Sequence, residues 1–294
     1  MADATARDVG EFGLIARVID RLAGSPAVLL GPGDDAAVVA APDGRVVATT
    51  DVLVEGVHFR RDWSSGYDVG RKAAAANLAD VAAMGGRGTA LLIGLAAPTD
   101  LPLAWALELT DGLRDEAALV GAAVVGGDVV RSATLVVSVT ALGDLEGRTP
   151  VTRGGARPGD VVVLAGELGR SAAGLARLTE GHRDGDAVDA HRRPTPPYAL
   201  GPALADAGAT AMCDVSDGLV ADLGHIARAS GVLIDLDPAD ELFLTGGEDH
   251  ALVATLPPAA SLPEGTRVIG RVLAGEPAVT VAGAPATGGW DHFG

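Results

Sequence analysis

Along the first half of the chain, short apolar runs alternate with longer stretches rich in alanine and leucine. The short runs predict strands and the longer stretches predict helices, because helices need more residues than strands do. The predicted strands are residues 27–30, 36–40, 45–51, 90–96 and 134–142. The predicted helices are residues 70–84 and 103–120, and the Gly85-Gly86 pair ends the first of them.

The second half follows a turn-rich segment, residues 147–160, which holds two prolines and four glycines. We expect this segment to separate two domains, residues 1–146 and 147–294. Residues 183–197 are polar and rich in proline, which predicts a surface connection. The predicted strands are 161–165, 210–215, 251–256, 268–272 and one around Ile234, and the predicted helices are 170–180 and 216–230. The whole pattern is typical of an α/β or α+β fold.

The amino-acid composition narrows the classes of protein to which the chain can belong. With 294 residues, 48% of them hydrophobic and 21% charged, the chain can bury a sizeable core. Its single cysteine, Cys213, excludes an internal disulfide and a zinc site built from several thiolates. The first residues lack a signal-peptide pattern, and no apolar run reaches the ~18 residues of a membrane helix. We therefore expect a cytoplasmic protein without a membrane partner.

The formal net charge of −17 repels phosphate backbones, so we expect no nucleic-acid partner. The same excess suits a protein that collects divalent cations, although it also serves solubility. Charge alone does not decide between these two interpretations.

Acidic residues gather in six short clusters, which we expect at strand ends and in glycine turns. A carboxylate at the end of a strand lies where α/β folds bind ligands, and adjacent glycines let phosphates approach the backbone. Turn formation alone explains any single cluster as readily, since Asp and Gly favour turns. The clusters are residues 31–35, 49–51, 77–80, 126–128, 214–218 and 246–249.

Taken together, the six clusters favour a binding function over turn formation. Converging carboxylates repel one another unless cations neutralise them, and hard oxygen ligands favour Mg²⁺, Mn²⁺ or Ca²⁺. Mg²⁺ characteristically binds a few carboxylates together with substrate phosphates. The sequence therefore favours a magnesium-dependent enzyme that handles nucleotide phosphates.

A Walker-type phosphate-binding loop, which requires a lysine, is excluded. Lys72 is the only lysine, it lies in a predicted helix, and no Gly-x4-Gly-Lys-[Ser/Thr] motif occurs. Metal ions, arginines and helix N-termini must then neutralise bound phosphates. Ser216 suits this role as the predicted N-cap of the 216–230 helix, a position that an ordinary capping serine also fills.

In their order along the chain, these clusters resemble the thiamine-monophosphate kinase family of the aminoimidazole-ribonucleotide-synthetase-like superfamily. The resemblance runs from Gly10 to the Trp290-Asp-His-Phe ending, and the ordered combination of segments is specific although each alone is weak. It implies a two-domain α/β (α+β) fold of mixed sheets covered by helices. The N-terminal domain would bind ATP and metal and form a homodimer, and the C-terminal domain would complete the substrate site. The matching segments are 33–36, 50–59, 77–85, 126–128, 214–219 and 246–249.

The resemblance also implies an activity, the phosphorylation of thiamine monophosphate by ATP with several Mg²⁺ ions as cofactors, and a set of residues for it. The catalytic residues would be Asp51, Asp128 and Asp217. The magnesium ligands, through side chains or backbone carbonyls, would be Asp35, Thr49, Thr50, Asp51, Asp80, Asp128, Asp214 and Asp217. The nucleotide contacts would be Gly127, Asp128, Arg153 and Ser216, and the contacts to thiamine phosphate would be His58, Glu248 and Trp290.

Several of these residues have plain structural alternatives. His58 could be a partly buried strand residue, Arg153 a solvated linker residue and Trp290 a packing anchor, although an indole also stacks well on a flat cation. Two departures from the family pattern fall near the presumed thiamine pocket. Residues 235–244 form a shorter segment than is usual, and His250 stands where Tyr or Phe is common.

Other functions remain as alternatives. Hydrogenase-maturation and selenophosphate-forming proteins of the same superfamily use a reactive cysteine near a terminus, whereas Cys213 is internal. An aminoimidazole ribonucleotide synthetase fits the composition, but the ending at Trp290 fits the thiamine family better. A non-catalytic nucleotide or metal sensor would be favoured by lost carboxylates, and every cluster is intact. An extracellular calcium-binding protein predicts an Asp-x-Asp-x-Asp-Gly loop, which is absent.

Overall fold

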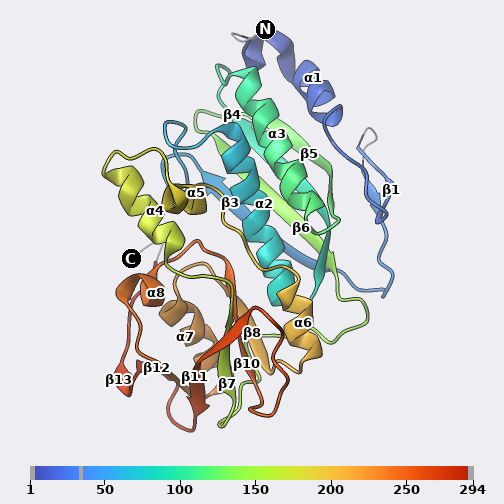
Figure 1. Cartoon of the computed structure of the whole chain (residues 1–294). Coiled ribbons are helices and arrows are strands. Elements are labelled where there is room, and N and C mark those ends of the chain that lie inside the picture. The colour runs from blue at the N-terminus through green and yellow to red at the C-terminus, as the bar shows by residue number, and fades with distance from the viewer. Residues whose placement is uncertain (1–3, 33–35, 291–294) are drawn as a thin grey trace. The chain divides into compact units, whose positions relative to one another are not determined.

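The computed structural model describes residues 4–32 and 36–290. The chain divides into two compact units (Figure 1). The N-terminal unit comprises residues 1–81 and 87–144, and the C-terminal unit comprises residues 82–86 and 145–294. The main division therefore lies two residues before the boundary that the sequence predicts at 146/147. The assignment of residues 82–86 to the C-terminal unit has no counterpart in the sequence pattern.

In the N-terminal unit, helices pack on one face of a four-stranded sheet with the order β3-β6-β4-β5 (Figure 1). The β4–β5 pair is parallel and the other pairs are antiparallel, so the sheet is mixed. A separate two-stranded ribbon, β1–β2, precedes it along the chain. The elements are α1 (Ala6–Ile19), β1 (Val28–Leu30), β2 (Val38–Val39), β3 (Val47–Val54), α2 (Gly66–Ala83), β4 (Arg87–Ala97), α3 (Leu103–Ala118), β5 (Ala123–Arg131) and β6 (Val136–Asp144).

The two faces of this sheet differ in burial because side chains alternate along each strand. Leu53 and Val139 are on the face towards the helices and are buried. On the opposite face, large apolar side chains remain exposed: Val52 is 47% exposed, Leu92 37% and Val130 50%. We call this second surface the open sheet face.

The C-terminal unit is built on a seven-stranded mixed sheet with the order β13-β12-β9-β11-β7-β10-β8. Only the β9–β12 pair is parallel among its described strand pairs. The elements are β7 (Val161–Ala165), α4 (Arg170–Thr179), α5 (Asp186–Arg192), α6 (Leu200–Asp206), β8 (Ala211–Val215), α7 (Leu219–Ser230), β9 (Leu233–Leu236), α8 (Glu241–Thr245), β10 (Ala251–Leu256), β11 (Thr266–Leu273), β12 (Ala278–Val281) and β13 (Ala284–Pro285).

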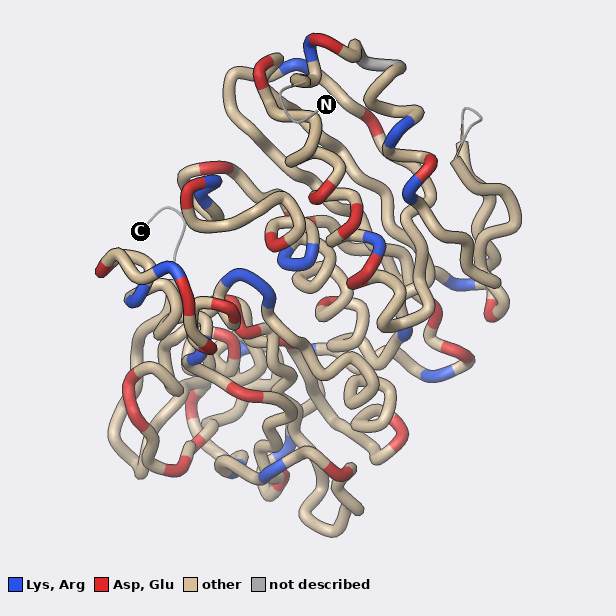
Figure 2. Tube along the Cα trace, turned by 45° about the horizontal axis from the view of Figure 1, so that its top comes forward, with Lys and Arg blue, Asp and Glu red and all other residues tan. Residues whose placement is uncertain are grey.

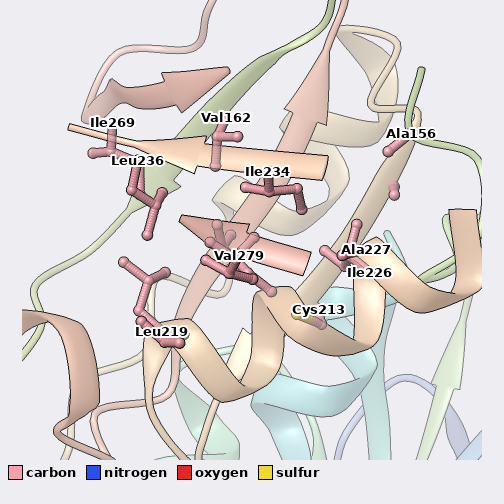
Figure 3. Close-up of a cluster of buried hydrophobic side chains, with 14 of the residues drawn as sticks. Ala156, Val162, Cys213, Leu219, Ile226, Ala227, Ile234, Leu236, Ile269 and Val279 are labelled. Carbon is pink, nitrogen blue, oxygen red and sulfur yellow. The ribbon is translucent and has the colours of Figure 1, made fainter. Parts of the chain in front are cut away.

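Apolar side chains fill both faces of this second sheet. Figure 3 shows the core between the sheet and α7, where Leu219 and Ile226 of the helix face Ile234 and Val279 of the strands. A second core on the other face includes Leu204 of α6. Because β10 lies between two partner strands and between two cores, all of its residues are buried, which explains its continuous apolar sequence.

The element types predicted from the sequence are largely confirmed, including the mixed α/β class and the end of α2 before Gly85. Three predictions are wrong. Residues 126–128 lie inside strand β5 instead of a glycine turn, and residues 49–51 lie in the middle of β3 instead of at its end. The predicted surface connection at 183–197 contains helix α5, whose Val188 is fully buried.

Helices α1, α6 and α8 and strands β5, β12 and β13 are additional to the predicted elements. Asp and Glu residues are spread over both units (Figure 2). Among the described residues, no helix is both long and apolar enough to cross a membrane.

Candidate active site

One group of candidate residues lies along the free edge of β3. The buried Asn77 of α2 accepts a hydrogen bond from the backbone N–H of Asp51 at 3.0 Å. One turn further along the helix, Asp80 accepts a hydrogen bond from the Thr49 hydroxyl at 2.7 Å. Because Thr49 and Asp51 are two residues apart on a strand, their side chains share the face that α2 covers. The structure therefore brings Thr49, Asp51 and Asp80 together.

Asp128 lies on the opposite edge of the same sheet. Strands β6 and β4 separate its strand, β5, from β3, a spacing of roughly 14 Å at ~4.8 Å per strand. The strand registers pair Asp128 with Val52 through Ser138 and Gly94, so its side chain is on the open sheet face. Within one chain, the structure does not bring Asp128 to Asp51.

Gly127 and Thr50, two further predicted residues of this sheet, have clear structural surroundings. Gly127 permits β5 to approach β4 closely, because an added Cβ would collide with the Ile93 carbonyl oxygen. Thr50 also lies on the open sheet face, where its hydroxyl donates to the Val139 carbonyl at 2.9 Å. The same hydroxyl accepts a hydrogen bond from the Thr140 hydroxyl at 3.1 Å, so it is engaged within the sheet.

His58 closes the turn after β3. Its Nδ1 accepts a hydrogen bond from the Val54 N–H at 3.0 Å, which leaves the proton of a neutral ring on Nε2. Lys72 of α2 donates to the His58 carbonyl at 3.2 Å. The single lysine of the chain therefore holds the turn that carries a predicted substrate residue, and its side chain is almost fully buried.

In the C-terminal unit, Asp214 lies near the end of strand β8, and the loop between β8 and α7 carries Ser216 and Asp217. Gly218 caps α7, so the prediction that Ser216 is the N-cap is wrong by two residues. Asp222, in the first turn of α7, reaches back into the loop and accepts hydrogen bonds from the N–H groups of Ser216 and Asp217, both at 3.1 Å. Its carboxylate therefore sets the shape of this loop.

The electrostatics of the loop follow from burial and like charge. Burial, followed by the negative charge of Asp214, raises the pKa of Asp222 to about 7. Burial also raises the pKa of the Cys213 thiol well above its usual value, which keeps that sulfur protonated and unreactive. Burial and the positive charge of Arg153 lower the pKa of His225.

The Gly-Gly-Glu-Asp segment packs directly against this loop. The Glu248 N–H donates to the Ser216 carbonyl at 2.8 Å, and the His250 N–H donates to the Val215 carbonyl at 3.0 Å. The His250 ring also meets Asp214, with Nδ1 3.1 Å from the Asp214 carboxylate. Glu248 and His250 both have positive φ, at 63° and 53°, so this backbone is tightly constrained.

Two predicted residues of this unit remain, and Trp290 borders the same loop. The Trp290 N–H donates to the Asp217 carbonyl at 2.9 Å, while its indole is largely exposed, so Trp290 is not a buried packing anchor. Arg153 is exposed in a segment held by Ser230, whose hydroxyl donates to the Arg153 carbonyl. The C-terminal unit thus gathers predicted metal, nucleotide and substrate residues around one loop.

The predicted magnesium ligands can be compared with the structure in part. Asp35 lies outside the described residues. Among the residues described, no three His, Cys, Asp or Glu side chains are grouped closely enough to hold a metal ion by themselves.

Comparisons with known proteins agree with these features. The family model described as AIR synthase related protein, N-terminal domain, matches residues 33–145, and the corresponding C-terminal domain model matches residues 157–280. A thiamine-monophosphate kinase of Mycobacterium tuberculosis is 50% identical over 99% of this chain and 93% of its own length. The chain belongs to the thiamine-monophosphate kinase family of AIR-synthase-related proteins. Thiamine-monophosphate kinase of Escherichia coli K12 is 40% identical over 84% of this chain and 83% of its own length.

Solved structures show the same relationship. AaThiL complexed with AMPPCP and TMP has a TM-score of 0.80 and 34% identity over 98% of each chain. Thiamine-monophosphate kinase of Stenotrophomonas maltophilia K279a has a TM-score of 0.79 and 32% identity, covering 93% of this chain and 95% of its own. Hydrogenase maturation protein HypE, at 19% identity and a TM-score of 0.74, shares the fold alone.

The structure gives three residues a role that the sequence analysis does not assign to them. Asn77 fixes Asp51, Asp222 fixes the loop of Ser216 and Asp217, and His191 lies 3.5 Å from Glu248. Asn77 comes three positions before the predicted site residue Asp80, and Asp222 comes five positions after Asp217. The polarity of both residues within otherwise apolar helix faces was an available signal. His191 lies 57 residues before Glu248 in a segment predicted as a surface connection, and no sequence signal pointed to it.

Proposed function

We propose that the chain transfers the γ-phosphoryl group of ATP to thiamine monophosphate, giving thiamine diphosphate and ADP. The observation that carries this proposal is the 50% identity to a thiamine-monophosphate kinase over 99% of the chain. The related AaThiL was solved with AMPPCP, an analogue of ATP, and TMP together. The acidic motifs of the chain also supply the oxygen ligands that such a reaction needs.

Magnesium is the cofactor that the residues fit best. The proposed ligands supply hard oxygen atoms throughout, with Thr49 and Thr50 adding hydroxyl or carbonyl oxygens to six carboxylates. These carboxylates are Asp35, Asp51, Asp80, Asp128, Asp214 and Asp217. The described residues form no ready-made cage of three carboxylates. Mg²⁺ suits such sites because it usually keeps several waters and shares its shell with substrate phosphates. When bound, Mg²⁺ supplies neutralisation of phosphate charge.

We assign the nucleotide contacts to Gly127, Asp128, Arg153 and Ser216. The exposed Arg153 guanidinium can pair with phosphate oxygens through two parallel hydrogen bonds. The approach of β5 to β4 at Gly127 holds the adjacent Asp128 on a regular strand. The hydrogen bonds from Ser216 and Asp217 to Asp222 fix the backbone from which Ser216 would reach the nucleotide.

For the acceptor, we assign His58, Glu248 and Trp290. The exposed Trp290 indole offers a face on which a cationic heterocycle can stack. The Glu248 carboxylate, one third exposed, complements the thiazolium charge or accepts a hydrogen bond from the aminopyrimidine. The Nε2–H of a neutral His58 ring can donate to a phosphate oxygen.

The reaction requires orientation more than proton removal. The acceptor is a phosphate monoester with a second pKa of about 6, so at neutral pH it is mostly dianionic and already nucleophilic. The site must bring two anions together in line, and binding them in place lowers the barrier. We therefore propose direct transfer, and a phosphorylated protein that passes its phosphate to the acceptor would contradict it.

Asp51 and Asp128 provide a test of the catalytic and metal assignments. Asp51→Asn and Asp128→Asn should each leave the fold intact but lower kcat at least about 100-fold at ordinary Mg²⁺, because a charged ligand is lost. Circular dichroism checks the fold, and binding of Mn²⁺ followed by electron paramagnetic resonance checks the metal directly. Asp68→Asn, on the first turn of α2, is a matched control that should retain activity. Near-normal turnover in both variants would remove the assignment.

We also propose that the protein is a cytoplasmic homodimer whose N-terminal units pair. The open sheet face supports the pairing, because Val52, Leu92 and Val130 form an exposed apolar surface on a regular sheet. The use of ATP supports the cytoplasm as its location.

The discriminating experiment compares acceptors under identical ATP and Mg²⁺. We expect kcat/KM for thiamine monophosphate to exceed that for thiamine, AMP and ribose 5-phosphate by at least about 1000-fold, since the site is built for a cationic, phosphorylated ligand. A substrate of the aminoimidazole-ribonucleotide type consumed at a comparable rate would favour the alternative within the superfamily. Binding of ATP without transfer to any of these compounds would favour a sensor.

A further inference from the structure

The side chain of Glu248 is met by a histidine from a distant helix. His191, on α5, is only 5% exposed, and its Nδ1 lies 3.5 Å from Glu248 Oε2. The same Nδ1 lies 3.1 Å from the hydroxyl of Ser171, which is fully buried on α4. Two polar side chains from separate segments, Ser171 and Glu248, therefore meet one ring nitrogen of His191.

The backbone around Glu248 is fixed independently of this contact. The neighbouring Asp249 accepts hydrogen bonds from the N–H groups of Gly169 and Ser171, at 2.7 and 2.8 Å, and so ties the segment to the start of α4. The Glu248 N–H is held by the Ser216 carbonyl. These hydrogen bonds hold the backbone on both sides of Glu248, so its conformation varies mainly through the side-chain torsions. His191 lies close enough to the carboxylate to restrict those torsions.

The position of His191 depends on close packing of α4 against α5. Gly174 of α4 makes this packing possible, because an added Cβ would lie 2.8 Å from His191 Cβ and collide with the Ala187 carbonyl oxygen. The two helices therefore form a compact hairpin that presents His191 to Glu248.

We propose that His191 is a positioning residue for Glu248 and that the α4–α5 hairpin thereby sets the affinity for the acceptor. The proposal rests on the proposed function, in which Glu248 contacts thiamine monophosphate. A carboxylate held in one rotamer meets the cationic acceptor without first losing side-chain freedom, which favours binding. His191 itself acts through Glu248 and does not touch the substrate.

The test uses two substitutions at His191 and one control. His191→Leu removes the polar ring and should raise KM for thiamine monophosphate about tenfold, because the Glu248 side chain loses the contact that restricts its torsions. KM for ATP and kcat should stay within about twofold. His191→Asn can place an amide N–H near the position of Nδ1 and should recover most of the loss. His182→Leu, at an exposed histidine before the hairpin's second helix, should change nothing.

A double-mutant cycle separates positioning from general damage. In a Glu248→Gln background, His191→Leu should have little further effect on KM for thiamine monophosphate, because the group it positions is already altered. Calorimetric titration with thiamine monophosphate should show the same pattern without turnover. If His191→Leu fails to fold, the Asn variant and its own cycle with Glu248→Gln decide the question.

The results that would contradict the positioning role differ from those that would contradict the proposed function. Unchanged KM for thiamine monophosphate in His191→Leu, equal losses for both substrates, or additive effects in the cycle would overturn the positioning role while the kinase activity stands. Normal affinity in Glu248→Gln would overturn the assignment of Glu248 and the inference with it. A wild-type protein that does not phosphorylate thiamine monophosphate would instead remove the proposed function itself.

Discussion

At the scale of single residues, Asp222 shows how a buried carboxylate serves a binding loop. Its Oδ2 accepts two backbone N–H groups, those of Ser216 and Asp217, and Asp222 itself is 3% exposed. Backbone donors that are buried without a partner are costly, so a loop of this shape requires an acceptor at this point. The residue is therefore structural for the loop, although it lies among groups that we assign to metal and nucleotide.

Replacing Asp222 by Leu should lower the free energy of unfolding by about 2–4 kcal/mol, because two donors lose their acceptor. Asp222→Asn should cost less, since the amide oxygen can still accept both hydrogen bonds. Urea denaturation of the two variants beside the wild type measures the difference. Equal stability of the Leu variant and the wild type would show that solvent replaces the carboxylate.

The raised pKa of Asp222 predicts a pH dependence of stability. The folded protein keeps this proton up to about pH 7, whereas the unfolded chain loses it near the ordinary value of 3.8. Between those values the folded state binds more protons, so this group makes the free energy of unfolding fall as pH rises. In EDTA-treated protein, Asp222→Asn should flatten the decline between about pH 4 and pH 7. Parallel curves for variant and wild type would contradict the shift.

At the scale of elements, the α4–α5 hairpin depends on a single glycine. Gly174→Ala places a methyl group against the Ala187 carbonyl, so α5 must move outward. We expect a loss of about 1–3 kcal/mol in the free energy of unfolding, as for other overpacked sites. Gly24→Ala, where an added Cβ meets no atom within 4 Å, is the matched control. Thermal unfolding that is unchanged in Gly174→Ala would show that the hairpin tolerates a wider spacing.

Helices and strands with a strong local sequence pattern could be predicted, whereas those stabilised by distant contacts could not. Strand β10 and helix α2 were predicted from local apolar patterns, which are strong in buried elements. Strand β5 was missed because Gly126 and Gly127 are typical of a turn, whereas here glycine serves close strand approach to β4. Helix α5 was missed because it has only seven residues, and contacts with α4 stabilise it more than its own composition does.

The same distinction applies to the candidate site. The acidic motifs pointed to residues that carry the chemistry, because oxygen ligands next to glycine are a local signal. The residues that hold them, such as Asn77 and His191, act across sequence separations of 26 and 57 residues. Single-sequence patterns do not encode such contacts. The geometry of Asp128, on the edge of the sheet opposite to Asp51, likewise depends on strand order, which the sequence left open.

At the scale of the whole molecule, the open sheet face predicts association of two copies through their N-terminal units. Leu92→Glu places a charge at the centre of this face and should convert a dimer into a monomer in analytical ultracentrifugation. Leu175→Glu, at an exposed leucine of α4 outside this sheet, should leave the dimer intact. A wild-type protein that sediments as a monomer at micromolar concentration would contradict the proposal.

All of the proposed residue roles serve phosphoryl transfer from ATP to thiamine monophosphate. The most direct measurement is chromatographic analysis of the products after the purified protein is incubated with both compounds and Mg²⁺. We expect thiamine diphosphate and ADP in equal amounts, and neither product once EDTA has removed the metal. ADP formed without thiamine diphosphate, or an equal yield of thiamine diphosphate in the presence of EDTA, would contradict it.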